Sequence, residues 1–266
     1  MRLLVSVLAI TLSAAVAEAK LEVREIQAAH GQFGPERKSA DYVAGDQVYF
    51  RYTLSGVRTD DEGRVKAEIV LRLTDVRGEK LLEKETALLA LLPLGGDTLT
   101  ANASIDLEEG FPPGEYELFV EFRDATAAKK TSFRRKFTVK APEFSLVRVR
   151  FAHDDEGKAP APAGGLVGQN LVIRLRAVGF DRSREMIDTE MRIDVLDAKG
   201  RAVMPQPIRA AVRSENPEEV KQVVSVDLSS SLSLNRAGDF TLRITLHDKA
   251  GGKKVSFECP LKVSAQ

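Results

Sequence analysis

The sequence predicts an all-β protein: two tandem antiparallel β-sandwiches of about seven strands each, preceded by an N-terminal signal peptide. Three observations support this prediction. The first residues have the layout of an export signal, the remaining chain repeats itself at an offset near 123 residues, and both copies alternate apolar and polar side chains with a period of two.

The N-terminus reads as a secretory signal peptide over residues 1–19. Arg2 provides a short positive region, residues 3–16 are apolar apart from Ser and Thr, and Ala17-Glu18-Ala19 offers the small residues that signal peptidase accepts. The apolar run is shorter than the roughly 20 residues of a membrane-spanning helix. We therefore expect cleavage after Ala19, export to the periplasm or the extracellular space, and no membrane span in the mature chain.

Length and charge limit the number of domains and the classes of ligand that the protein can bind. The 247 residues after the signal suit two domains. The chain has 39 Lys and Arg against 39 Asp and Glu, so it lacks the positive field that binding to nucleic acid or to anionic membrane requires. Its single cysteine, Cys259, allows no intrachain disulfide, and its position in an alternating strand predicts that the thiol is buried.

An internal repeat organises the chain. The segment 45–51 matches 168–174 without a gap, at an offset of 123 residues. Further matches follow in the same order, with offsets between about 121 and 124: His30 with His153, Leu73–Gly78 with Val195–Gly200, Ser104–Leu107 with Ser225–Leu228, Gly114–Tyr116 with Gly238–Phe240 and Arg123-Asp124 with His247-Asp248. We expect one domain at residues 20–140 and a second at 143–264, joined at Ala141-Pro142.

Each copy has the alternation of half-buried strands. In the first copy the segments 48–55, 67–74 and 116–123 place apolar residues at every second position, which predicts one face in the core and one in water. The second copy repeats the pattern, and turn signals such as Pro112-Pro113-Gly114 and Ala250-Gly251-Gly252 separate the runs. Short strands with polar turns favour a sandwich over an α/β fold.

The segment Pro113-Gly114-Glu115-Tyr116 resembles the entry to the sixth strand of immunoglobulin-like and fibronectin type III modules, which occur in bacterial exported proteins. The resemblance implies a tyrosine corner, in which the Tyr116 hydroxyl bonds back to the preceding turn. The second copy has Ala237-Gly238-Asp239-Phe240 instead, and phenylalanine has no hydroxyl. The resemblance implies an architecture and no single function.

No residue pattern indicates catalysis, a cofactor or a metal site. The three histidines, His30, His153 and His247, accompany no Gly-x-Ser-x-Gly elbow and lack the spacing of zinc ligands. We interpret His30 and His153, which occupy the same slot of the repeat, as loop histidines that bond to backbone. The acidic segments 59–63 and 153–157 could supply calcium ligands, but they occupy non-equivalent positions, so hairpin turns are the favoured interpretation.

Two aromatic residues fall on faces that the alternation assigns to solvent, Tyr49 and Phe119. Exposed rings of this kind are typical of carbohydrate-binding surfaces. The alternative is that each ring is covered by a loop or by the other domain.

One apolar segment stands out at residues 87–94, and the corresponding part of the second copy is polar. If this segment is exposed, it is a contact surface for a protein partner. The alternative interpretation is a strand that covers the sandwich core. The candidate partner-binding residues are Leu88, Leu89, Leu91, Leu92 and Leu94.

The sequence therefore favours a non-enzymatic structural or interaction module that binds a protein partner in the cell envelope or outside the cell. Two alternatives stay open. Aromatic residues grouped on one open face would favour a module that binds polysaccharide or another envelope polymer. A protruding loop at Leu88–Gly96 would favour a protease inhibitor or a chaperone-like binder.

Overall fold

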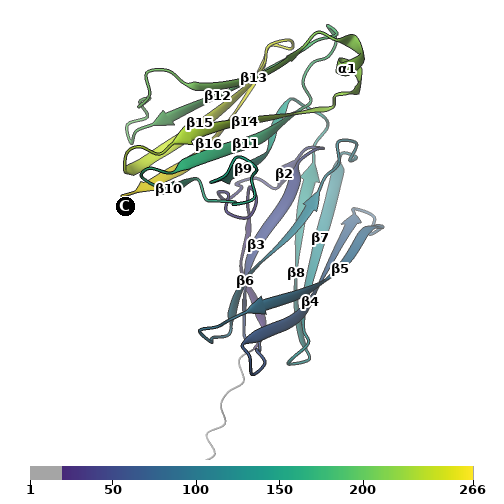
Figure 1. Ribbon diagram of the computed structural model, residues 1–266. Helices are drawn as coiled ribbons and strands as arrows, with labels where there is room; N and C mark the ends of the chain where they lie inside the picture. Colours follow the sequence, from purple (N-terminus) through teal and green to yellow (C-terminus); the bar gives the residue numbers. More distant parts are fainter. Residues whose placement is uncertain (1–19, 266) are drawn as a thin grey trace, which may run out of the picture.

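The computed structural model describes residues 20–265, and it confirms the all-β prediction (Figure 1). The predicted signal peptide, residues 1–19, lies outside the described residues. The strands form four sheets, two with three strands and two with five, which assemble into two tandem β-sandwiches. We call them the first sandwich, strands β1 to β8, and the second sandwich, strands β9 to β16.

The first sandwich packs a three-stranded sheet, in the order β1-β3-β6, against a five-stranded sheet, in the order β2-β8-β7-β4-β5. All neighbours are antiparallel except β2 and β8. The strands are β1 (Glu22–Ala28), β2 (Asp41–Tyr42), β3 (Gln47–Ser55), β4 (Arg64–Asp75), β5 (Lys80–Leu91), β6 (Thr98–Asp106), β7 (Gly114–Asp124) and β8 (Lys129–Val139).

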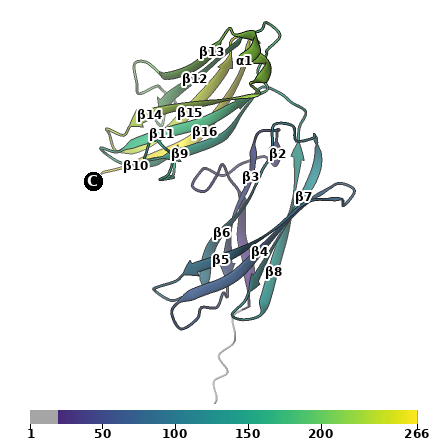
Figure 2. The ribbon, with the colours of Figure 1, turned by 45° about the vertical axis from the view of Figure 1, so that its right-hand side comes forward.

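The second sandwich repeats this topology, with sheets in the orders β9-β11-β14 and β10-β16-β15-β12-β13 (Figure 2). A short helix, α1 (Pro217–Gln222), lies between β13 and β14. The strands are β9 (Ser145–Ala152), β10 (Gly164–Leu166), β11 (Asn170–Val178), β12 (Ile187–Leu196), β13 (Ile208–Ser214), β14 (Ser225–Ser233), β15 (Gly238–Asp248) and β16 (Lys253–Ser264).

Each sandwich has its own apolar core. The first core draws its buried residues from Leu21 to Val139 and the second from Phe144 to Val263. The expected alternation is visible in β3, where Val48, Phe50, Tyr52 and Leu54 are all buried. Because burial of alternate apolar side chains is the main stabilising contribution in such a fold, each sheet face is specified by its own strand sequence.

Irregular features recur in both sandwiches at the 123-residue offset. Glu25 in β1 and Arg148 in β9 both have a left-handed backbone, with φ values of 52° and 53°, where the ladder to the neighbouring strand shifts register. Gly56 and Gly179 approach the residues before β1 and β9 so closely that an added Cβ would lie within 2.4 Å of a backbone carbonyl oxygen. The repeat therefore extends to strained backbone positions as well as to the cores.

One match of the sequence repeat is wrong. The strand ladders pair Gln47 with Asp106 and Asn170 with Ser233, so Ser104–Leu107 corresponds to Ser231–Leu234 and not to Ser225–Leu228. The cause is a longer connection between β13 and β14, which contains α1 and shifts the offset locally. Residues 225–228, Ser-Val-Asp-Leu, resemble residues 104–107, Ser-Ile-Asp-Leu, more than the true counterpart Ser-Leu-Ser-Leu does.

The tyrosine corner that the resemblance implies is present in the first sandwich. The Tyr116 hydroxyl donates to the carbonyl oxygen of Pro112 at 2.8 Å. In the second sandwich the ring of Phe240 lies at the corresponding place, and the guanidinium carbon of Arg236 is 5.2 Å from its centroid.

The two sandwiches touch at the ends of β2 and β9. Val43 is buried in one small cluster with Val147 and Val178 of the second sandwich. Beside this cluster, Arg148 Nε donates to the carbonyl oxygen of Gly45 at 2.7 Å. We propose that the domain boundary lies at Ala141-Pro142, between the residues of the two cores.

Gly45 is the position where this contact is most sensitive to substitution. Its φ is +88°, and an added Cβ would lie 2.8 Å from Cγ1 of Val178. We expect Gly45→Ala to lower the melting temperature and to increase interdomain mobility, measured by small-angle scattering. Gly78→Ala is the matched control, since Gly78 has φ +81° but nothing within 4 Å of its Cβ position. Equal effects of both variants would show that the Val178 contact is unimportant.

Candidate functional site

The structure separates the five candidate leucines into two groups. Leu88 and Leu92 are half-buried and pack against the first core. Leu89, Leu91 and Leu94 point into solvent, with 70%, 60% and 99% of their surface exposed. The division follows from strand geometry, because residues 88–91 belong to β5 and alternate between its faces. Both interpretations of the segment therefore apply, each to a different set of residues.

Strand β5 lies at the edge of its sheet, with β4 as its neighbour on one side (Figures 1 and 2). The three-stranded sheet does not cover the inner face of β5 along much of its length. Leu82, Lys84 and Thr86 are therefore exposed, although they lie on that inner face. Leu81 is also exposed. The first half of β5 carries charges, including the inward-facing Lys84, whereas residues 87–91 carry none and offer an apolar edge on which another chain could pair.

The corresponding strand of the second sandwich, β13, is also an unpaired edge of its sheet. Strand β13 lies against β14, and α1 places Val220 in the core. On the outer face of β13, Arg213 occupies the position that corresponds to Leu89, because each pairs with the equivalent residue of the neighbouring strand. A charge on an edge strand is a common protection against unwanted pairing. The first sandwich lacks this protection along Leu89 and Leu91.

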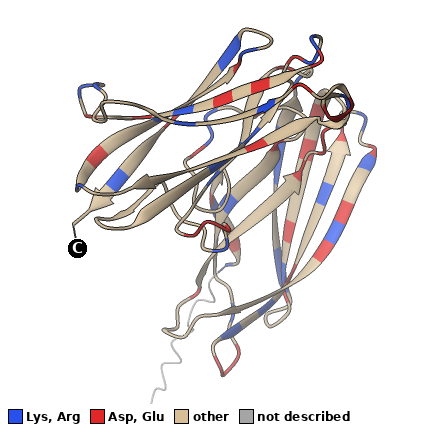
Figure 3. Ribbon diagram, turned by 45° about the horizontal axis from the view of Figure 1, so that its top comes forward, with Lys and Arg blue, Asp and Glu red and all other residues tan. Residues whose placement is uncertain are grey.

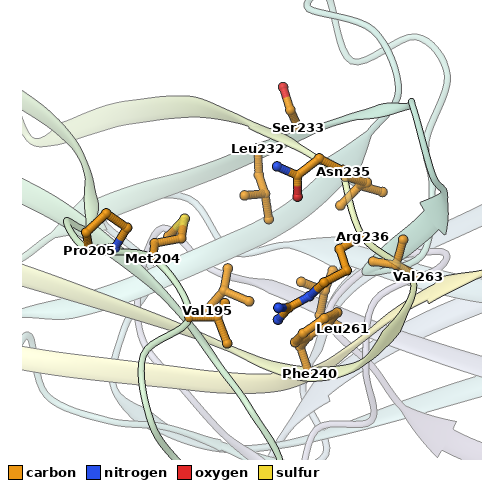
Figure 4. A pocket seen from close by; sticks show the side chains of 12 residues that line it. Val195, Met204, Pro205, Leu232, Ser233, Asn235, Arg236, Phe240, Leu261 and Val263 are labelled. Atoms are coloured by element: carbon orange, nitrogen blue, oxygen red, sulfur yellow. The ribbon is translucent and has the colours of Figure 1, made fainter.

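A cavity of about 490 Å³ lies in the second sandwich where the tyrosine corner of the first sandwich has its counterpart (Figure 4). The loop between β12 and β13 forms one wall with Met204 and Pro205, and Arg236 lies beside Phe240 on the other. Its lining contains no Asp, Glu, His or Cys, and its polar side chains are Ser233, Asn235 and Arg236.

A second cavity, which we call the interdomain cleft, has a volume of about 440 Å³ and is lined by both sandwiches. The first sandwich contributes the loop at residues 30–34, together with Tyr49 and Asn102. The second contributes Arg150, Arg174 and the loop at residues 156–161. This cleft combines aromatic, amide and guanidinium groups. No local sequence pattern predicts it, because its walls come from distant segments.

His30 is the most perturbed titratable group in the cleft. Its ring packs edge-on against Phe257 of the second sandwich, with 4.9 Å between the ring centroids. Burial, assisted by the positive charge of Arg37, lowers the pKa of His30 to about 4. The ring is therefore neutral at physiological pH. His153, at the same place in the repeat, has its Nδ1 3.0 Å from the carbonyl oxygen of Asn170, as expected for a loop histidine.

Neither outward aromatic forms an open platform. Tyr49 is buried at the interdomain cleft, which fits the alternative that the other domain covers it. Phe119 is half-buried between two guanidinium groups, Arg72 at 5.4 Å and Arg134 at 4.6 Å from the ring centroid. Basic and acidic residues alternate along this outer face of the five-stranded sheet (Figure 3).

The acidic segments form turns, but not hairpins, since each lies in a connection between strands of different sheets; their leading carboxylates accept backbone hydrogen bonds. Asp60 accepts from the backbone N–H groups of Glu62 and Arg64, at 3.1 and 2.9 Å, which helps to lower its pKa to about 2. Asp154 accepts from Glu156 and Lys158 in the same way. Within residues 20–265, no group of three or more His, Cys, Asp or Glu side chains is placed to hold a metal ion.

The prediction for Cys259 is confirmed: the residue is buried, and burial raises the pKa of its thiol to about 12. Such a thiol stays protonated and unreactive. Across residues 20–265, no helix has the length and apolar character to cross a membrane.

Comparisons with known proteins give no family. No protein-family model matches the chain, and no curated protein matches it. Among solved structures, the chain is similar to the C-terminal domain of the Streptococcus pyogenes antigen I/II-family protein AspA, with 12% identity and a TM-score of 0.31 over 91% of this chain and 99% of that one.

Two larger proteins are similar at the same level. Dimeric latent PorU from Porphyromonas gingivalis has 13% identity and a TM-score of 0.40, and red sea bream transglutaminase has 10% and 0.28. Each comparison covers 94% of this chain, but only 21% of PorU and 32% of the transglutaminase. Identities and scores this low transfer no function to this chain.

The low pKa of His30 predicts that the free energy of unfolding depends on pH. The unfolded chain binds a proton at His30 below pH 6.5, whereas the folded protein does so only near pH 4, so acidification favours unfolding. We expect the free energy of unfolding to fall by up to about 3 kcal/mol between these pH values through this group. Chemical denaturation should show that His30→Gln removes that part of the slope, while His153→Gln keeps it. Parallel pH profiles of wild type and His30→Gln would contradict this assignment.

Proposed function

We propose that the chain is an exported, non-catalytic interaction module that binds a protein partner through the outer edge and outer face of β5. The observation that carries this proposal is the exposure of Leu89 and Leu91 on an edge strand. Their side chains, with that of Leu94, supply apolar contact area. The backbone of β5 supplies hydrogen-bonding groups along an edge that no strand of this chain covers among residues 20–265.

The comparison between the two sandwiches supports this choice of surface. Exposed leucines on a strand edge promote unwanted association, and the second sandwich has the charged Arg213 where the first has Leu89. The stability of the first sandwich does not require Leu89 or Leu91, since both lie outside its core. A partner strand that covers β5 would give these side chains a role.

The mode we propose is addition of a partner strand next to β5. The unit available for pairing ends at Leu91, because Pro93 cannot donate a backbone hydrogen bond. The segment 88–96 supports a strand-pairing role over an inhibitory loop, since its first four residues belong to β5. The predicted signal peptide supports export, which would place this surface in the periplasm or outside the cell.

Paired substitutions on the two faces of one segment test the proposal. We expect Leu89→Ser with Leu91→Ser to keep the melting temperature and to abolish partner binding, because both side chains are exposed. Leu88→Ser with Leu92→Ser is the matched control on the core-facing side, and we expect it to destabilise the first sandwich by about 2 kcal/mol. Circular dichroism melting curves measure both effects.

The partner is detected by photo-crosslinking. A benzophenone side chain at position 89, in the mature protein added to the envelope fraction of its native host, should form a crosslinked product. The same group at Arg213, on the corresponding edge of the second sandwich, should not. Equal products at both positions, or crosslinking that survives the Leu91→Ser change, would refute binding through β5.

A further inference from the structure

The interdomain cleft contains a pair of arginines of the same charge directly opposite each other. Arg150 in β9 and Arg174 in β11 are register partners across the antiparallel ladder, and both are exposed on the side of the sheet that lines the cleft. Like charges at directly opposite positions destabilise a sheet. The repulsion therefore lowers the stability of the sheet, and because both side chains are exposed, apolar packing does not compensate for it.

Within residues 20–265, neither Arg150 nor Arg174 forms an ion pair. Asp227, the acid that interacts with Arg174, is bonded to Arg176 and acts on Arg174 only through longer-range charge attraction. Arg174 Nη1 donates to the backbone carbonyl oxygen of Glu156 at 2.8 Å, and Arg150 Nη2 lies 3.5 Å from Oε1 of Gln47. The carboxylate of Glu156, which also lines the cleft, pairs with Lys158.

The adjacent arginines of the same sheet, Arg148 and Arg176, do form ion pairs with carboxylates. Arg176 bonds to Asp227 at 2.8 Å and lies 3.3 Å from Glu109 of the first sandwich. Arg148 is 3.4 Å from Asp106, also of the first sandwich. Arg148 and Arg176 therefore form ion pairs with acids. Arg150 and Arg174, which line the cleft, do not.

The first sandwich shows that the fold does not need this pair. The register partners at the corresponding positions of β1 and β3 are Gln27 and Arg51. The same ladder thus accepts glutamine at the place of Arg150. The second sandwich therefore has one more arginine at this pair of positions than the first.

The rest of the lining suits a sugar ring. Phe33 presents an exposed aromatic face, with 43% of its surface accessible, and Asn102 and Gln32 offer amide groups that donate and accept hydrogen bonds. Guanidinium groups bind carboxylate and sulfate oxygens with two parallel hydrogen bonds. A volume of about 440 Å³ lies within the range of small-molecule sites.

We infer that the interdomain cleft binds an acidic saccharide, with the anionic group held by Arg150 and Arg174 and a sugar ring against Phe33. The ligand spans the two sandwiches, because Phe33 belongs to the first and both arginines belong to the second. This site and this ligand class are independent of partner binding at β5.

Isothermal titration calorimetry on the mature protein, residues 20–266, tests the inference with four probes. A galacturonate hexamer carries carboxylates, a heparin-derived hexamer carries sulfates, maltohexaose is neutral, and potassium sulfate supplies the anion alone. We expect at least one acidic hexamer to bind, maltohexaose to bind at least about tenfold more weakly, and affinity to fall as salt rises. The heparin hexamer also carries uronate carboxylates, so binding of the galacturonate hexamer shows that carboxylates suffice, whereas binding of the heparin hexamer alone shows that sulfates are required.

The variants separate a binding role from a structural one. Arg150→Gln, which installs the residue found at the corresponding place in the first sandwich, should weaken the acidic hexamer at least about tenfold and leave the melting temperature equal or higher. Arg174→Gln should weaken it similarly, and Phe33→Ala should weaken the hexamer without changing sulfate binding. Arg209→Gln, on the far edge strand β13, is the control for loss of one charge.

Three results would overturn the inference. They are equal affinity of wild type and Arg150→Gln for the acidic hexamers, equal affinity of wild type for neutral and acidic hexamers, and binding of inorganic sulfate with no binding of either acidic hexamer. A lower melting temperature of Arg150→Gln would also count against it, since the pair would then stabilise the sheet.

Discussion

The contact of Val43 with Val147 and Val178 is the constraint on which the relation between the two sandwiches depends. It forms where the turn before β3 meets the ends of β9 and β11, and it requires Gly45 because a side chain there would collide with Val178. Arg148 adds a hydrogen bond to the same turn. The cleft, the burial of Tyr49 and the packing of His30 on Phe257 all follow from this docking.

The internal repeat provides comparisons inside one molecule. Positions that agree between the copies, such as Gly56 and Gly179, serve backbone geometry and core packing. Positions that differ in chemistry while keeping the same register mark surfaces that the fold leaves free to change. Two such differences concern the proposed binding surfaces. Gln27 corresponds to Arg150 at the cleft, and Leu89 corresponds to Arg213 at the sheet edge.

These two surfaces lie on different parts of the chain and suit different ligands. The β5 edge offers backbone groups and apolar side chains, which suit a polypeptide strand. The cleft offers guanidinium and amide groups beside one ring, which suit a compact anionic molecule. Together, the two proposed surfaces would let one chain connect a protein to a saccharide.

The sequence by itself determined the strand content, the two cores and the burial of Cys259, because these depend on alternation within short segments. The tyrosine corner of Tyr116 was implied by the resemblance to immunoglobulin-like modules. It also located the apolar segment at 87–94, but not which leucines face the core. The register of the second sandwich near α1, the exposure of Leu89 and the arginine pair of the cleft were decided by the tertiary structure. Each depends on strand pairing or domain docking between residues far apart in the chain, and no local pattern encodes those distances.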